Sequence, residues 1–431
     1  MLTPSRAAAS RLALATICTV ISIGPVLRAQ QNGATLALVG GTIYVDPIAE
    51  PIRNGVVLVQ NGRIARVGDR QSLPIPRETP TIDCSNLTVV AGYWNSHVHF
   101  LQRKWADAAT LPASELAQQL QSMLTQYGFT TVFDTWSPWE NTRRIRDRVE
   151  SGETAGPRIR STGEAMFGKG EAVPPAAWAS LGFIPLERFQ VASVATEAEA
   201  RTASLALLDR GVDGLKFYAA TPGASSRLVP EAAMAAGVAE AHGRGKLVFS
   251  HPSSVAGLLA SVHAGVDVIG HTTPQSGPWD SATIVAMKAA GVALIPTLKL
   301  WTYEFRHERA SLENRFVETA VGQLRGWNEA RGVVLFGTDV GYMSDYDTLE
   351  EFVLMARAGM TTRQILASLT TSPAERFGAS KEFGRIAAGM VGDLTVLRGD
   401  PSADVRAFAA VAYTIRDGRV IYRDPLLKPS R

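Results

Sequence analysis

Residues 89–99 read VVAGYWNSHVH, and this stretch decides the fold. It is a short apolar run that ends in two histidines, His97 and His99, separated by one residue. Side chains two positions apart on a strand point to the same side of it. The stretch therefore predicts a buried strand whose last residues present two imidazoles together.

Seven further apolar stretches follow, each succeeded by a helical pattern. With the first, the strand candidates lie near residues 89–99, 130–135, 158–163, 214–219, 246–251, 268–272, 293–298 and 333–339. The helical segments often end at a glycine that suits the left-handed closing residue: Gly128, Gly152, Gly211, Gly245, Gly265, Gly291 and Gly332. Eight alternations favour an α/β fold with a parallel sheet, and units that close on themselves form a (β/α)8 TIM barrel. An open, doubly wound sheet is the alternative.

The two ends of the chain have a different pattern of short alternating runs. Strand candidates lie at residues 36–44, 55–60 and 64–67 near one end and at 393–397, 411–415 and 420–422 near the other. Asn61-Gly62 and Asp417-Gly418 are hairpin signals. Because chain termini often lie close together, we expect both ends to build one small β-sandwich domain. Its parts would be residues 30–88 and 385–431, with the barrel over 89–384.

Composition and the N-terminus limit the possible partners and compartment. The 431 residues include 43 Lys and Arg against 40 Asp and Glu, a balance that gives no reason to expect nucleic-acid binding. Arg6 and Arg11 precede an apolar run, residues 12–27, which predicts a signal peptide over 1–29, cut after Ala29. An uncleaved anchor is the alternative. We expect a secreted or periplasmic protein with no stable membrane span after cleavage. A monomer and a homo-oligomer both stay open.

Residues able to bind metals recur at the predicted strand ends. They are His97, His99, Lys216, His251, His271 and Asp339. Catalytic groups of a barrel lie at these ends, and imidazole and carboxylate suit divalent metals. Taken singly, each has an ordinary structural interpretation, such as a packed core histidine, a helix-capping aspartate or a lysine that reaches outward. Their joint occurrence within one eightfold pattern predicts a metal site.

The motifs around these residues resemble those of the amidohydrolase superfamily. The matching pieces are VAGYWNSHVH (90–99), DGLK (213–216), AGVDVIGH (264–271), FGTD (336–339), SPA (372–374), AGMVGDL (388–394) and IRDGR (415–419). Within the superfamily the chain is similar to imidazolonepropionase and the metal-dependent Xaa-Pro dipeptidases. The resemblance covers residues 35–422.

This resemblance implies a site with two metal ions, most often zinc, with manganese or cobalt as alternatives. His97, His99 and Asp339 would hold the first ion and His251 and His271 the second. Lys216, carboxylated on its amine, would bridge both. A hydroxide shared by the ions would attack a carbonyl carbon, with Asp339 as the proton shuttle to the leaving nitrogen.

Residues that contact the substrate are harder to predict. The loop over 163–170 lacks the Gly-Gly-His of dipeptidase-like relatives, which puts a strict dipeptidase substrate in doubt. Tyr218 and Lys169 are tentative substrate contacts. Trp94, Trp136, Trp139 and Trp301 lie near strand ends, where they would either line an apolar pocket or pack the rim. Lys299, Tyr303 and His307 are further candidates after the seventh strand.

The function predicted from these features is that of an exported binuclear metal-dependent amidohydrolase acting on a small-molecule amide. The bond would be a non-standard or dipeptide-like C–N bond. The alternatives are a hydrolase of cyclic amides or esters, a mononuclear deaminase on the same barrel, and a metal-stabilised binding protein without activity. Lys216 disfavours the deaminase, because a single-metal site needs no bridging ligand.

Overall fold

The fold comes from a computed structural model, which describes residues 35–170, 175–220 and 227–427. All of them belong to one compact unit, residues 33–431. The predicted signal peptide, residues 1–29, lies outside the described residues, so cleavage and export remain predictions. In the part of the chain that is described, no helix has both the length and the apolar character needed to cross a bilayer.

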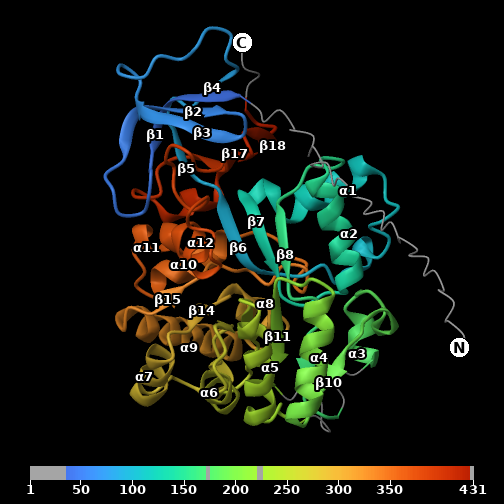
Figure 1. Cartoon of the computed structure of the whole chain (residues 1–431). Helices are drawn as coiled ribbons and strands as arrows, with labels where there is room; N and C mark the ends of the chain where they lie inside the picture. Colours follow the sequence, from blue (N-terminus) through green and yellow to red (C-terminus); the bar gives the residue numbers. More distant parts are fainter. Residues whose placement is uncertain (1–34, 171–174, 221–226, 428–431) are drawn as a thin grey trace, which may run out of the picture. The chain divides into compact units, whose positions relative to one another are not determined.

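Strands from both ends of the chain form one eight-stranded sheet, in which blue and red strands lie together in Figure 1. They are β1 (Leu36–Ile43), β2 (Ile52–Gln60), β3 (Arg63–Asp69), β4 (Thr81–Asp83), β5 (Leu87–Ala91), β16 (Leu394–Arg398), β17 (Val411–Arg416) and β18 (Arg419–Arg423). The order is β18-β17-β16-β5-β1-β2-β3, with β4 beside β1. The ends therefore combine in a single sheet, and its description as a sandwich remains a proposal.

Sequence alternation explains how this sheet is covered. Leu36 and Leu38 on β1 belong to one buried apolar cluster, whereas Ala37 and Val39 belong to another. Neighbouring side chains of a strand point to opposite faces, so both faces of the sheet are packed. The predicted turn at Asn61-Gly62 is present, with φ of 52° and 75° at the two residues, as a type I′ hairpin requires.

The middle of the chain supplies parallel strands only. One sheet has the order β6 (Tyr93–Val98), β7 (Phe129–Asp134), β8 (Arg158–Ser161). The other has the order β10 (Ala192–Ser193), β9 (Met166–Phe167), β11 (Gly214–Tyr218), β12 (Leu247–Ser250), β13 (Val268–Gly270), β14 (Ala293–Ile295), β15 (Val333–Val334). Backbone hydrogen bonds also join the first strand to the segment after β15: Ser96 N donates to Phe336 O and His99 N to Val340 O. Each predicted strand region thus contains a strand, and the fold is α/β with parallel sheets.

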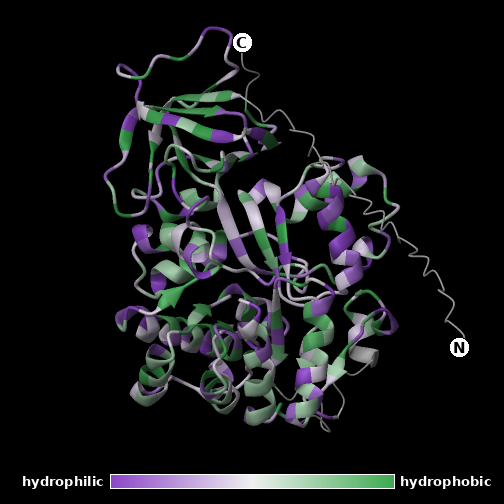
Figure 2. Cartoon of the chain, viewed as in Figure 1, coloured by the Kyte–Doolittle hydropathy of each residue, from purple (hydrophilic) through white to green (hydrophobic). Residues whose placement is uncertain are grey.

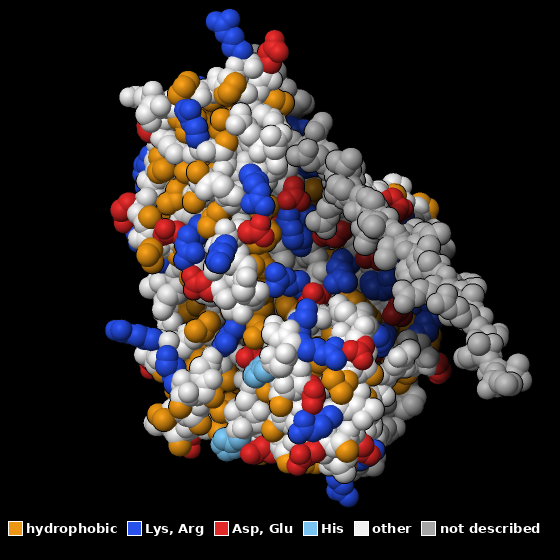
Figure 3. All heavy atoms as spheres, viewed as in Figure 1, with side chains coloured by type: hydrophobic (Ala, Val, Ile, Leu, Met, Phe, Trp, Pro, Cys, Tyr) orange, Lys and Arg blue, Asp and Glu red, His pale blue; other side chains and the backbone are white. Residues whose placement is uncertain are grey.

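Helices alternate with these strands. They are α1 (Ala113–Met123), α2 (Trp139–Glu150), α3 (Pro175–Ser180), α4 (Glu197–Asp209), α5 (Glu231–Gly243), α6 (Val255–His263), α7 (Ser281–Ala289), α8 (Lys299–Phe305), α9 (Ala310–Glu329), α10 (Leu349–Arg357), α11 (Thr362–Leu369) and α12 (Thr371–Arg376). On α2 the buried residues recur every three or four positions, while much of its visible side is hydrophilic in Figure 2. Figure 3 shows basic and acidic side chains interspersed on the viewed face.

Two local expectations need correction. The stretch 89–99 is two strands, because the chain passes at Gly92 from β5 in the end sheet to β6 among the parallel strands. A Cβ at Gly92 would come within 2.3 Å of Thr130 Oγ1, so this crossing needs glycine. Gly332 does not supply the left-handed residue after α9, since Arg331 does, with φ of 55°. Gly332 instead avoids Trp327, whose ring a Cβ would meet at 1.9 Å.

Candidate metal centre and cavity

The six predicted ligands lie within or after parallel strands of the middle of the chain. His97 is in β6, Lys216 is in β11, and His251 and His271 directly follow β12 and β13. The adjacent strands fix these positions through the backbone, as His251 N donates to Phe217 O and His271 N to Ile295 O. Five of the six residues are buried, and His251 is partly exposed.

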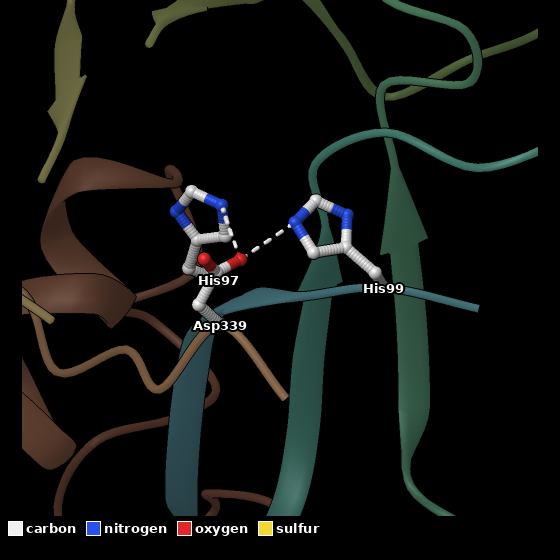
Figure 4. A group of neighbouring side chains, drawn as sticks. All are labelled: His97, His99 and Asp339. Atoms are coloured by element: carbon white, nitrogen blue, oxygen red, sulfur yellow. Dashed lines mark ion pairs between the residues drawn. The ribbon is translucent and has the colours of Figure 1, made fainter. Parts of the chain in front are cut away.

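His97, His99 and Asp339 form the tightest group, with ligand atoms within 4.8 Å of one another. Asp339 Oδ1 lies 2.8 Å from His99 Nε2 and 3.4 Å from His97 Nε2. Figure 4 shows this oxygen directed at both imidazole rings. Asp339 reaches this place because its backbone N–H donates to His97 O over 2.9 Å. The segment after β15 is thereby tied to the end of β6.

Lys216 and the other two histidines adjoin this group. Lys216 Nζ lies 3.4 Å from His97 Nε2. The ring of His271 is 4.6 Å from that of His97 and 4.5 Å from that of His251, between centroids. Every one of the six predicted side chains is therefore linked to the next by a direct contact. The structure thus brings these distant segments together, while the roles of the six residues as ligands stay a prediction.

The hydrogen bonds of His99 test whether this group suits a cation. Its Nδ1 lies 2.8 Å from the backbone oxygen of Trp136, which can only accept, so Nδ1 carries a proton. In the neutral ring Nε2 is then an acceptor, and it faces the acceptor Asp339 Oδ1 at 2.8 Å. Two lone pairs at that distance repel unless a proton or a cation lies between them. The group therefore fits a metal ion.

His271 offers a second donor atom of the same kind. Its Nδ1 lies 2.6 Å from Thr297 Oγ1, whereas Nε2 is buried and makes no hydrogen bond with any described residue. A metal-bound histidine typically has its other ring nitrogen bonded in this way, which fixes the ring. His271 thus has the environment of a metal ligand.

Burial sets the protonation states that metal binding requires. It lowers the pKa of His97, His251 and His271 well below the usual range, and nearby positive groups lower it further. Burial also lowers the pKa of Lys216 to about 8, although Asp339 opposes the shift. For Asp339 burial favours the neutral acid, but interactions with His99, His271 and Lys216 outweigh it and lower the pKa. His97, His251 and His271 are therefore neutral and Asp339 is ionised at neutral pH.

The backbone around the centre is strained. His271 and Asp339 have φ of 76° and 60°, in the left-handed region that non-glycine residues rarely occupy. Two residues after Asp339, the backbone of Gly341 lies against that of His99. Glycine permits this contact, since a Cβ there would meet His99 O at 1.8 Å. Such strain is typical of functional sites, where the surrounding structure maintains it.

A cavity of about 270 Å3 adjoins the centre and includes His99, Lys216, His251 and Asp339 in its lining. Aromatic side chains dominate the rest: Trp136, Trp178, Tyr218, Trp301 and Tyr342. The ring of Tyr218 stacks on that of His251 at 4.0 Å between centroids. Burial, and then the charges of Asp339 and Glu304, raise the pKa of Tyr218, so its hydroxyl stays protonated and can donate. A small aromatic or apolar molecule fits such a cavity.

The other predicted substrate contacts lie elsewhere. Lys169 is half exposed, pairs with Glu199 at 3.0 Å and is not part of the cavity lining, so its role remains a prediction. The lining also lacks Lys299, Tyr303 and His307. Of the four tryptophans, Trp136 and Trp301 line the cavity, whereas Trp94 and Trp139 are buried in apolar clusters.

Sequence reasoning missed Glu304, Tyr342 and Trp178 in the lining. Helical spacing could have indicated Glu304. Leu300, Trp301 and Glu304 share one face of α8, whereas the predicted Lys299 and Tyr303 share an adjacent face. Tyr342 and Trp178 had no such signal.

Parallel strands with a buried His-His-Asp group at their carboxyl ends are typical of metal-dependent enzymes with an α/β fold. Comparison with known proteins gives the family. Residues 88–421 match the model of the amidohydrolase family, and the chain belongs to that family. It is therefore a hydrolase that acts on carbon–nitrogen bonds, in a family that generally depends on metal.

Individual relatives agree with this assignment. The chain is 22% identical to an ochratoxinase of Aspergillus niger over 444 residues, which covers 94% of this chain and 90% of the relative. A proposed prolidase from Bifidobacterium longum superposes with a TM-score of 0.76 at 27% identity, over 90% and 95% of the two chains. A Xaa-Pro dipeptidase with bound methionine gives 0.76 at 22%, over 91% and 100%. The expected family is confirmed, and the fold is TIM-barrel-like.

Proposed function

We propose that this protein is an exported, binuclear metal-dependent amidohydrolase that cleaves a non-standard or dipeptide-like amide bond in a small molecule. The observation that carries the proposal is the short distance of 2.8 Å between His99 Nε2 and Asp339 Oδ1, two acceptor atoms that a bound cation would hold together. The relatives support the reaction class, since an ochratoxinase and a Xaa-Pro dipeptidase are among them.

The assignment of ligands follows the contacts. His97, His99 and Asp339 would hold one ion, and His251 and His271 a second. Lys216 supports the binuclear form, because its buried Nζ lies 3.4 Å from His97 Nε2, where an ammonium would repel a cation but a carboxylated amine would bind it. Zinc is the expected metal, with manganese or cobalt as alternatives.

Bound divalent ions would lower the pKa of water and polarise the scissile carbonyl. Asp339 then accepts a proton from the attacking water and delivers it to the leaving nitrogen, which leaves poorly unless protonated. Tyr218, protonated and in the cavity lining, donates a hydrogen bond to the substrate. Lys169 is a tentative further contact, which requires its ion pair with Glu199 to open.

Finer features of the architecture belong to the same proposal. We propose that the parallel strands close into a (β/α)8 barrel over residues 89–384. Support comes from the bonds of Ser96 and His99 to the segment after β15, and from Asp213 N, just before β11, which donates to Ser161 O of β8. The sheet of the chain ends would form a β-sandwich, and residues 1–29 a signal peptide.

Metal content and activity together test the proposal. We expect about two ions per chain by mass spectrometry of the metal-loaded protein, and hydrolysis of at least one class among dipeptides, N-acyl amino acids and lactams. His251→Ala should lose one ion, whereas His242→Ala, an exposed histidine paired with Asp267, should keep both. The mass of the exported chain should place its start at residue 30.

Other results would overturn it. One ion per chain, unchanged by His251→Ala, would favour a mononuclear enzyme, which the tight three-residue group of His97, His99 and Asp339 could hold alone. Failure of the metal-loaded protein on every amide and ester tested would contradict amide hydrolysis itself.

A further inference from the structure

One wall of the cavity carries a carboxylate that the metal centre does not use. Leu300, Trp301 and Glu304 of α8 line the cavity together. Tyr342 adjoins them, and its hydroxyl donates to Glu304 Oε1 over 2.7 Å. The hydrogen bonds of the described residues include none to the second oxygen, Oε2. Glu304 therefore presents a carboxylate at the cavity surface with one oxygen available to a ligand.

The helix that carries Glu304 is anchored to α10. Buried Glu351 accepts hydrogen bonds from the backbone N–H groups of Leu298 and Lys299, over 3.0 and 2.8 Å, at the start of α8. Thr302 donates to Glu350 over 2.7 Å. These bonds fix the backbone of α8, and the Tyr342 hydroxyl restrains the Glu304 carboxylate, so less conformational freedom is lost when a ligand binds.

Charge is unevenly distributed in the lining. The Lys, Arg, Asp and Glu residues of the described lining are Lys216, Glu304 and Asp339. Lys216 and Asp339 belong to the candidate metal centre. Among the described residues, the lining contains no other lysine and no arginine. Away from the metal centre, the described lining therefore offers a substrate carboxylate no lysine or arginine, and the Glu304 carboxylate would repel it.

Aromatic rings surround the same space. Trp136, Trp178, Tyr218, Trp301 and Tyr342 line the cavity with Glu304. Aromatic faces attract cations, more strongly where water is excluded. A fixed carboxylate among such rings is a suitable environment for a protonated amine attached to an apolar body.

We propose that this cavity selects amide substrates bearing a protonated amine, which binds Glu304 among the aromatic rings, and disfavours substrates with a carboxylate at that position. This selectivity rests on the proposed function, because it concerns which amides the protein hydrolyses. The substrate class it names is a predominantly apolar amide that carries a protonated amine.

Binding tests the subsite without any turnover. Tryptophan fluorescence of the metal-loaded protein should report binding, since three tryptophans line the cavity. We expect phenethylamine to bind about tenfold or more tightly than phenethyl alcohol, the value of a hydrogen bond to a charged group. In Glu304→Gln the preference should fall below about threefold. Glu308→Gln, which removes an exposed carboxylate four residues on, should keep it. Equal affinity of the wild type for both ligands would overturn the proposal.

Turnover provides a separate arm. Two matched pairs place the amine on either side of the amide: phenylalanine 2-naphthylamide against its 3-phenylpropionyl counterpart, and an N-acyl 4-(aminomethyl)anilide against the 4-methylanilide. We expect a higher kcat/KM for the amine in at least one pair, lost in Glu304→Gln mainly through KM, with the amine-free partner unchanged. Hydrolysis without any amine preference would refute the subsite and leave the proposed function standing. Amine-selective binding without hydrolysis of any amide would support the subsite and refute the proposed function.

Discussion

The strand ends and the α8 wall contribute to the same cavity in different ways. The metal-centre residues lie in or directly after short parallel strands, and neighbouring strands fix them by backbone hydrogen bonds such as His251 N to Phe217 O. Glu304 and Tyr342 lie on a seven-residue helix and on a loop, and side-chain bonds such as that of Thr302 to Glu350 hold them. Backbone hydrogen bonds between strands persist when a side chain is substituted, whereas a hydrogen bond made by a side chain is lost with it. The strand ends are therefore suited to a constant reaction and the wall to a variable substrate.

The largest effect should come from the strand-end region. We expect Asp339→Asn to fold and keep part of its metal, but to lose turnover by about 10²–10⁴-fold, because the amide cannot accept and return a proton. Steady-state kinetics with metal analysis checks this. Asp209→Asn, an exposed carboxylate paired with Arg244, is the control and should be fully active. Near-normal turnover of Asp339→Asn would remove this residue from the proton shuttle.

A smaller effect should follow from loosening one strand-end ligand without removing it. Thr297→Val deletes the hydroxyl 2.6 Å from His271 Nδ1, and we expect metal affinity to fall about 10–100-fold. Competition with a chelator measures this. Thr319→Val loses only an exposed hydroxyl that bonds within α9 and serves as the matched variant. If both variants release metal alike, the Thr297 hydrogen bond does not orient His271.

The wall should respond to pH through Glu351. Burial raises the pKa of Glu351 to about 7, against 4.5 for a free carboxyl, so the folded state favours the protonated acid. The stability this contributes is complete below about pH 4.5 and is lost as pH rises through 7, by roughly 1.4 kcal/mol per unit of pKa difference. Glu351→Gln does not titrate. We therefore expect its melting temperature to rise relative to that of the wild type from about pH 5 to pH 8. Parallel melting curves would show that Glu351 does not ionise in this range.

The smallest effect should come from Lys169, which lies in neither region. A half-exposed lysine makes weak charge interactions, so we expect Lys169→Met to change kcat/KM by no more than about threefold. Kinetics on the best amide of the panel checks this. A loss of tenfold or more would mean that the loop over 163–170 reaches the substrate and belongs to the wall.

The contrast also explains what the sequence could predict. Histidines two apart at the end of an apolar strand, or a Thr-Asp after one, have positions set by strand geometry. His97, His99 and Asp339 could therefore be placed near strand ends before any coordinates. The crossing at Gly92 could not, because it depends on a side chain from another strand, Thr130. Helical spacing places Glu304 on one face of α8 with the predicted Trp301, but only the rotation of α8 against its neighbours decides whether that face lines the cavity.

The sheet shared by the chain ends has a consequence for how the molecule is made. Strand β5 leads through Gly92 into β6, which carries His97, and its partner across the ladder is β16, with Ala91 opposite Leu394. These strands emerge from the ribosome about 300 residues apart, and such long-range pairing is slow. The nascent chain cannot complete this ladder until synthesis is almost finished. It therefore reaches its native packing late, a property that suits a polypeptide threaded through a translocation channel before it folds.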